Sequence, residues 1–252
     1  MLGQPEPAIP LKGRGRGTNP SGIAGSSYIP SLDGLRAASI LIVLLSHAGA
    51  SCLIPGGFGV TVFFFLSGFL ITTLLTREHD RYGSIALGAF YLRRLVRLGP
   101  PLLACLLLAG VAAMLGLAGA DLDRSTLVSQ ILFYYNYHSL LTGSDEWVNG
   151  LGILWSLSVE EHFYLIWPAL FIAIGRRWIG LRHLIVLLVA LLVWRSFRYF
   201  VLGSSEWSIY ISTDTRFDSL LYGCVLALMH WRGVAGQVFP TGRSALALLR
   251  RL

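Results

Sequence analysis

The sequence predicts an all-α protein, a polytopic bundle of transmembrane helices. Of its 252 residues, 54% are hydrophobic and only 13% are charged, and the mean hydropathy is +0.65. Soluble domains carry about 25% charged residues, so the polar shell that a water-soluble core needs is missing. This composition excludes soluble enzymes, secreted disulfide-bonded domains and disordered proteins.

Six apolar runs are each roughly twenty residues long, which is enough to cross a hydrocarbon core of about 30 Å. They cover residues 34–54, 57–75, 98–118, 151–174, 184–202 and 215–231. A shorter run, 127–142, contains Gln130, Asn136 and His138. This run could span the membrane, re-enter it or lie at its surface.

Arginines mark one side of the predicted bundle. The loops 76–97 and 175–183 carry five and three arginines, whereas 119–126 and 143–150 are acidic. Basic loops stay in the cytoplasm, so this pattern gives six spans with both ends inside, provided that 127–142 does not cross. If that run crosses, the basic loop 175–183 lies outside, against the rule.

Two tails flank the predicted membrane domain, which covers residues 28–231. Residues 1–27 are rich in Gly, Pro and Ser with a few basic charges, a composition typical of a disordered tail. Residues 232–252 form a basic tail or a truncated helix that is too short to span the bilayer.

Several kinds of site are not expected. The cysteines Cys52, Cys105 and Cys224 lie in or beside apolar runs without C-x-x-C spacing, so we expect small buried side chains and no metal site. The net charge is +7, but the basic residues lie mostly between apolar runs, where they set topology. We therefore expect a lipid bilayer, and no nucleic acid, as the partner of these charges.

The first apolar run carries two ionisable groups, Arg36 and His47. An ionisable group in a membrane helix costs about 2.5–3.5 kcal/mol, which makes each a candidate functional residue. Eleven residues make three turns plus about 20°, so both side chains project from nearly one face, about 16 Å apart along the axis. Alternatively, the two residues anchor the ends of the span, with Arg36 reaching the interface.

The run 151–174 contains Glu160, Glu161 and His162, about ten residues from its start. Glu160 and Tyr164 share a helical face because they are four residues apart. One carboxylate could line a cavity. The alternative is a buried ion pair with an arginine of a later run, namely Arg195, Arg198 or Arg216.

Arg93, Arg94 and Arg97 precede a proline pair at the cytoplasmic end of the third run. Two planar guanidinium groups on one face, such as those of Arg94 and Arg97, can bind a multiply charged phosphate. Topology and contact with lipid headgroups would also explain these arginines.

The segment 213–223 places Asp214, Arg216 and Asp218 at the outer start of the last run. Such alternating charges could form a local salt bridge, which is worth little if exposed. They could also form the wall of a polar chamber.

Five blocks of the sequence resemble, in order, the acyltransferase 3 family of integral-membrane O-acyltransferases. They are IPSLDGLRAASILIVLLSHAG, GGFGVTVFFFLSGFLIT, FYLRRLVRLGP, LWSLSVEEHFYLIWPAL and TDTRFDSLLYGCVLAL. The resemblance covers roughly residues 28–231 and includes the family's R-x10-H and W-S-L-x-x-E patterns.

The resemblance implies transfer of an acyl group, commonly acetyl, from cytoplasmic acyl-CoA to a hydroxyl of a glycan, lipid or small molecule at the cell surface. Acyl-CoA is then a donor substrate, and no permanently bound cofactor is implied. Nineteen of the 20 basic residues are arginine, which suggests a GC-rich bacterial genome and hence the bacterial inner membrane.

The resemblance also implies roles for single residues. His47, Arg36 and Glu160 would be catalytic, and Arg94 and Arg97, with the adjacent Arg93, would engage the phosphates of coenzyme A. The remaining candidates would line the substrate cavity: Trp155, Tyr164, Ser67, Arg216 and Asp218.

Two departures from the family keep other functions open. His162 stands where the family often has Gln, and the family's membrane domain usually has more spans than the six predicted here. The chain could therefore be a truncated, inactive member. It could also be a transporter or flippase of glycolipid type, whose pathway the same intramembrane charges would line.

Overall fold

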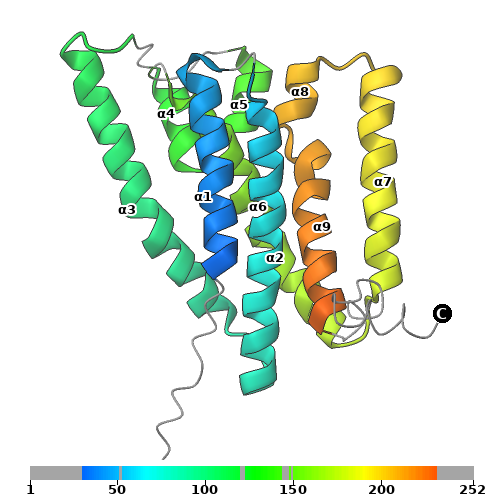
Figure 1. Cartoon of the computed structure of the whole chain (residues 1–252). Coiled ribbons are helices and arrows are strands. Elements are labelled where there is room, and N and C mark those ends of the chain that lie inside the picture. The colour runs from blue at the N-terminus through cyan, green and yellow to red at the C-terminus, as the bar shows by residue number, and fades with distance from the viewer. Residues whose placement is uncertain (1–29, 51–52, 120–122, 144–147, 149, 232–252) are drawn as a thin grey trace, which may run out of the picture.

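The computed structural model describes residues 30–50, 53–119, 123–143, 148 and 150–231, and this part of the chain contains helices and no strand. The all-α prediction is therefore confirmed (Figure 1). The helices are α1 (Pro30–Leu45), a π-helical turn (Ser46–Ala50), α2 (Gly56–Tyr82), α3 (Leu87–Met114), α4 (Arg124–Ile131), α5 (Tyr135–Thr142), a 3₁₀ turn (Leu151–Leu154), α6 (Trp155–Gly175), α7 (Leu181–Phe200), α8 (Glu206–Ile211) and α9 (Thr213–Trp231). The predicted tails 1–27 and 232–252, and Cys52, lie outside the described residues.

Five helical segments are long and apolar enough to cross a membrane. They are Ser31–Ala50, Gly56–Tyr82, Leu87–Met114, Leu151–Gly175 and Leu181–Phe200. In Figure 1 they run alternately up and down, and α3 leans away from the others at its upper end. The chain is accordingly a multi-pass membrane protein.

The sixth predicted span, 215–231, forms most of α9. This helix is not among the five, and it carries Asp214, Arg216 and Asp218. It nevertheless packs against both α2 and α7 and lies between them in Figure 1. Its charges are therefore accommodated inside the bundle, where polar groups of membrane helices find partners.

The run 127–142 does not form one long helix. It is divided between α4 and α5, each of eight residues, or about 12 Å, and neither is long enough to span a membrane alone. This agrees with the non-crossing interpretation.

The side chain of Asp123 caps the start of α4. Its carboxylate accepts hydrogen bonds from the backbone N–H and the hydroxyl of Thr126, both at 2.9 Å, and from the Ser125 hydroxyl. Such caps satisfy a backbone donor that the first helical turn leaves free. These bonds favour the charged carboxylate, so the pKa of Asp123 lies well below its usual range.

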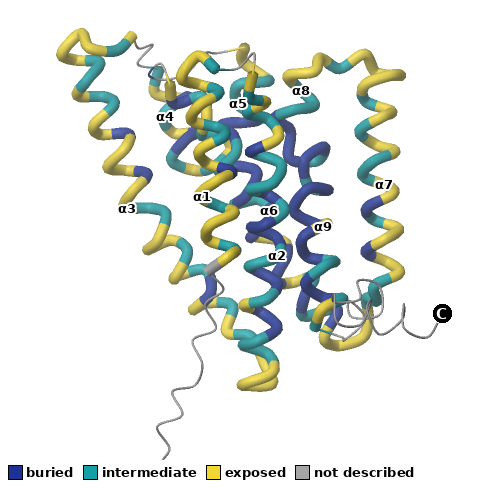
Figure 2. Tube along the Cα trace, viewed as in Figure 1, coloured by how far each residue is buried: buried dark blue, intermediate teal, exposed yellow. Residues whose placement is uncertain are grey.

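The most buried part of the bundle is the contact between α2, α6 and α9 (dark blue in Figure 2). There α2 and α9 approach closely at two glycines. A Cβ on Gly68 would lie 2.0 Å from the carbonyl oxygen of Leu220, and a Cβ on Gly223 would lie 2.0 Å from that of Phe65. Small residues permit such close approach of membrane helices, which explains the glycines of the S-G-F and Y-G-C segments.

The basic connections share one end of the bundle. The α2–α3 and α6–α7 connections and the C-terminus of α9 lie at the bottom of Figure 1, whereas α4, α5 and α8 lie at the top. We refer to the former as the arginine-rich end. By the positive-inside rule it is expected to face the cytoplasm.

Candidate functional site

A cavity of about 280 Å³ lies between α1, α2, α3 and α6. We call it the central cavity. Phe63, Leu70, Leu74, Leu98 and Leu157 form its apolar wall. Its polar wall consists of Arg36, Ser67, Arg94, Arg97, Ser156, Glu160 and Tyr164. Six residues that the sequence singled out as catalytic or binding groups thus meet at one cavity, although they come from four helices.

Helical spacing explains how each helix contributes its part. Arg94 and Arg97 are three residues apart on α3, and Glu160 and Tyr164 are four residues apart on α6. Both spacings place side chains on one face, and both pairs line the central cavity. The shared faces predicted for these pairs are therefore observed.

The guanidinium of Arg94 lies over two aromatic rings. Its guanidinium carbon lies 3.3 Å from the ring centroid of Tyr164 and 5.5 Å from that of Phe90. Guanidinium groups stack favourably on aromatic faces. These contacts hold the guanidinium at the wall of the central cavity.

Three buried polar atoms at the central cavity lack a hydrogen-bond partner within the described residues. They are Ser67 Oγ, Arg94 Nε and Glu160 Oε1, and Glu160 is only 7% exposed. An unsatisfied buried polar group costs about 1–3 kcal/mol, so such groups usually mark a place for water or a ligand. The cavity is therefore suited to a polar ligand.

The formal charges at the central cavity favour an anion. Arg36, Arg94 and Arg97 contribute three positive charges against the one carboxylate of Glu160. The guanidinium carbon of Arg36 lies 5.1 Å from the ring centroid of Phe63. Charges in a partly enclosed site are screened less than charges in water, so the excess of arginine attracts negatively charged groups.

Among the described residues, the α6 carboxylates form no ion pair with Arg195, Arg198 or Arg216. Arg195 pairs instead with Asp218 at 2.8 Å, and Arg198 pairs with Asp214 at 3.0 Å. Arg216 donates to the Thr61 hydroxyl at 2.9 Å.

His47 does not line the central cavity. It lies in the π-helical turn Ser46–Ala50, where its exposed ring contacts the carbonyl of Val43 through Nδ1 at 2.8 Å. Regular α-helix ends at Leu45, so the spacing rule that aligned His47 with Arg36 does not extend to it. Since a carbonyl only accepts hydrogen bonds, Nδ1 carries the proton and Nε2 of the neutral ring keeps its lone pair.

Arg93 is also separate from the central cavity. Its side chain is exposed and forms an ion pair with Glu78 of α2 at 3.2 Å. It lines a different hollow, at the turn between α2 and α3.

Three further candidates belong to the packed core between α2, α6, α7 and α9. Trp155 is buried against Phe64, with ring centroids 6.0 Å apart. The buried guanidinium of Arg216 lies 5.5 Å from the same Phe64 ring. Asp218 is buried in its ion pair with Arg195. None of the three lines the central cavity.

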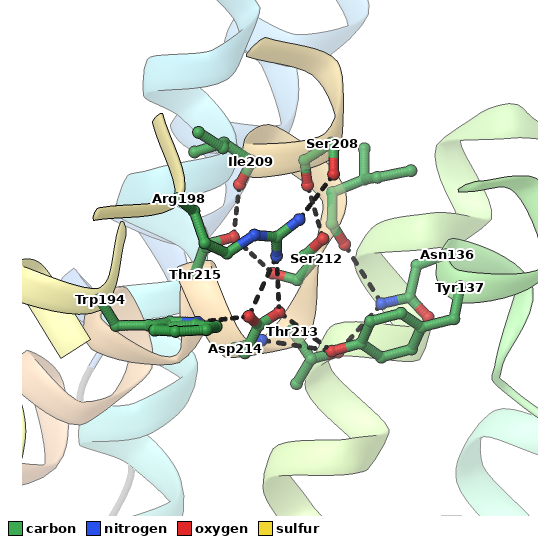
Figure 3. Close-up of polar contacts among 11 residues, drawn as sticks. Asn136, Tyr137, Trp194, Arg198, Ser208, Ile209, Ser212, Thr213, Asp214 and Thr215 are labelled. Carbon is green, nitrogen blue, oxygen red and sulfur yellow. Dashed lines mark hydrogen bonds and ion pairs between the residues drawn. The ribbon is translucent and has the colours of Figure 1, made fainter. Parts of the chain in front are cut away.

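A polar network near the top of α9, shown in Figure 3, contains residues that sequence reasoning did not combine. Asp214 accepts from Trp194 Nε1 at 2.6 Å, from Arg198 at 3.0 Å and from the Tyr137 hydroxyl at 3.2 Å. The carboxylate thus ties α5 and α7 to α9. The available signals were Asp214 itself and the polar residues of the run 127–142, but partners far apart in sequence cannot be assigned from spacing.

The same network includes His162. Its Nδ1 lies 2.8 Å from the hydroxyl of Thr213, which also accepts from Asn136 Nδ2 at 2.9 Å. The ring of His162 stacks on that of Tyr137, with centroids 6.0 Å apart. In this chain, the residue that departs from the family pattern therefore joins α6 to α5 and α9.

Comparison with known proteins supports the same family as the sequence blocks. The family model described as an acyltransferase domain matches residues 29–249. The chain belongs to the acyltransferase 3 family. The match begins before α1 and ends after α9, so it covers all the helices that line the central cavity.

Two relatives illustrate the likeness. The peptidoglycan O-acetyltransferase OatA of Listeria monocytogenes serovar 1/2a is 34% identical over 214 residues, which are 80% of this chain and 34% of that protein. The O-acetyltransferase OatA of Staphylococcus aureus strain NCTC 8325 is 32% identical over 212 residues, 80% of this chain and 35% of that protein. This acyltransferase 3 chain therefore spans about a third of the length of these relatives. No solved structure matches it.

Proposed function

We propose that this chain is a membrane O-acyltransferase that transfers an acyl group, with acetyl as the first candidate, from acyl-CoA to a hydroxyl of a cell-envelope carbohydrate. We place it in a bacterial inner membrane. The observation that carries the proposal is the central cavity, which combines three arginines, a buried glutamate and an apolar wall. Family membership and the names of the two relatives support the class of reaction.

Acyl-CoA fits the chemistry of this cavity. Its phosphates are anionic, and Arg94 and Arg97 offer two planar guanidinium groups from one helical face near the arginine-rich end. The uncharged arm that ends in the thioester would extend along Phe63, Leu70 and Leu74. The donor would thus enter from the cytoplasmic side and place its thioester inside the bundle.

In the proposed reaction, the acyl group moves from the sulfur of CoA to the hydroxyl oxygen of the acceptor. The acceptor hydroxyl oxygen attacks the thioester carbonyl carbon, the new C–O ester bond forms, and the C–S bond breaks so that the CoA sulfur leaves with the electron pair. His47 Nε2 would take the hydroxyl proton as general base, since Nδ1 donates to Val43. His47 could instead carry the acyl group briefly.

The remaining residues would support this transfer. Arg36 would stabilise negative charge that develops on the thioester oxygen or on the donor. Glu160 would orient the arginines around the bound donor, because its buried Oε1 has no other partner among the described residues. Arg36 lies on α1, and His47 lies in the π-helical turn that follows its end at Leu45, so the donor arm would extend along α1 between them.

The test is transfer of label in membranes that contain the full chain. Incubation with acetyl-CoA labelled in the acetyl group should place label on envelope carbohydrate. Membranes with the Glu160→Gln variant should show little transfer, and those with Arg182→Gln, an exposed arginine of α7 at the same end, should match wild type. Export of a glycolipid without label transfer would instead support a flippase and overturn the proposal.

A further inference from the structure

A second hollow, of about 590 Å³, lies at the arginine-rich end beside the turn between α2 and α3. We call it the turn hollow. Three arginines line it, Arg77, Arg81 and Arg93, together with Glu78 and Tyr82. The function proposed above uses none of these groups; only Arg93 was expected, from the family resemblance, to contact a phosphate of the donor.

Two features of the sequence hold this turn in place. Gly83 ends α2 in a left-handed conformation, with φ at 69°, and its N–H donates to the carbonyl of His79 at 2.7 Å. Glycine adopts this conformation without steric cost. The carboxylate of Glu78 then accepts from the Ala86 N–H at 2.8 Å and from Arg93 at 3.2 Å. Arg93 is thereby fixed on the side of α3 that faces the end of α2.

The turn hollow and the central cavity are lined by neighbouring residues of α2 and α3. Leu74 lines the central cavity and Arg81 lines the turn hollow; seven residues separate them, which is about two turns or 10 Å on one face of α2. On α3, the adjacent residues Arg94 and Arg93 line the central cavity and the turn hollow respectively. A single extended ligand could therefore occupy both.

The lining of the turn hollow suits a phosphate next to an aromatic base. Its three arginines outnumber the one glutamate, and a guanidinium binds phosphate in bidentate fashion. Tyr82 is 66% exposed, and the Arg81 guanidinium carbon lies 5.3 Å from its ring centroid. An exposed aromatic ring beside an arginine offers a surface on which a nucleobase can stack.

We propose that the turn hollow binds the 3′-phosphate and the adenine ring of coenzyme A, through Arg81, Arg93 and Tyr82. This inference rests on the proposed function, because it assigns the nucleotide end of the same donor. Arg94 and Arg97 then serve the diphosphate, and the turn hollow distinguishes a 3′-phosphorylated donor from one that lacks this group.

The experiment measures equilibrium binding of CoA and of 3′-dephospho-CoA to the full chain purified in a neutral detergent. The variants are Arg81→Gln and Arg93→Gln, with Arg182→Gln as the matched control, since it removes an exposed arginine at the same end outside the hollow. We expect wild type to bind CoA about tenfold more tightly than 3′-dephospho-CoA, as for a partly exposed charge-assisted contact. In the two variants the Kd for CoA should rise about tenfold while the Kd for 3′-dephospho-CoA stays unchanged.

Four other binding results would contradict this inference or the proposed donor. Equal binding of the two ligands by wild type would overturn this inference and leave the proposed function standing. Equal weakening of both ligands by Arg81→Gln or Arg93→Gln would also overturn it. A preference for CoA that vanishes on addition of phosphatidylglycerol would assign the turn hollow to a lipid phosphate instead. Binding of neither ligand by wild type would contradict the proposed donor class itself.

Discussion

The guanidinium of Arg94 lies over the ring of Tyr164, with its carbon 3.3 Å from the ring centroid. This contact joins α3, which carries Arg94 and Arg97, to α6, which carries the buried Glu160. Arg94 and Tyr164 are far apart in the sequence, so residue spacing does not predict their contact. Both side chains nevertheless line the central cavity. The ring therefore sets the direction from which the guanidinium can bind an anion.

Replacement of Tyr164 by leucine should weaken donor binding. Tyr164→Leu removes the ring that Arg94 lies over, and a cation–π contact is worth about 0.5–2 kcal/mol, so the Kd for CoA should rise about twofold to thirtyfold. Tyr164→Phe keeps the ring and should bind CoA nearly as wild type. Equal Kd values for Tyr164→Leu and wild type in a titration would show that the stacking does not orient Arg94 for binding.

Removal of the His47 ring should reduce turnover and leave donor binding intact. General base catalysis contributes about 10²–10⁴-fold, so His47→Ala should lower kcat by that factor with an unchanged KM for acetyl-CoA. His230→Ala is a suitable control, because His230 is also exposed but lies in the last turn of α9 at the other end of the bundle. Wild-type kcat in the His47→Ala protein would remove His47 from the mechanism.

Alanine at Gly68 should destabilise the bundle. The added Cβ would lie 2.0 Å from the backbone oxygen of Leu220, so α2 and α9 must move apart, at a cost of about 1–3 kcal/mol. Thermal unfolding in detergent should show a lower Tm. Gly88→Ala in α3 is the matched control, since nothing lies within 4 Å of the Cβ it would add; an equal fall in Tm for both variants would contradict the close contact.

Neutralisation of Asp214 should loosen the top of α9. Asp214→Asn removes the charge that pairs with Arg198. We expect the free energy of unfolding to fall by about 1–2 kcal/mol. This is less than for a fully buried pair, because the Asp214 side chain is 36% exposed. Thermal unfolding of Asp214→Asn, Arg198→Gln and the double variant forms a cycle that isolates the pair. Additive losses would indicate that the two side chains act independently.

The start of α4 should become less stable in acid. The pKa of Asp123 is lowered in the folded chain by hydrogen bonds from Ser125 and Thr126, so its stabilising effect is complete above the ordinary aspartate pKa of about 3.9 and is lost as the pH falls towards the lower folded value. Amide exchange at Thr126, compared with the intrinsic rate at each pH, should show protection that declines only below about pH 4. In Asp123→Asn the protection should no longer depend on pH in this range.

Residue spacing predicted which site residues share a helical face wherever the helix is regular. Arg94 with Arg97, and Glu160 with Tyr164, lie on regular parts of α3 and α6, and they share faces as their spacing predicted. Spacing did not predict the position of His47 relative to Arg36, because α1 ends at Leu45 and a π-helical turn begins at Ser46. The position of Arg93 was also not predictable, since its partner Glu78 lies on another helix.

By itself, the sequence determined that the chain is a helical membrane protein of the acyltransferase 3 family and which ends of its helices are basic. Composition and the length of apolar runs suffice for that conclusion, because each helix must satisfy its own backbone in lipid. Only the tertiary structure decided which charges meet. Arg195 reaches Asp218 and Arg94 reaches Tyr164 because the tertiary packing brings together helices that are distant along the chain. Such packing depends on the shapes of both partners, as at Gly68 and Gly223, where α2 meets α9.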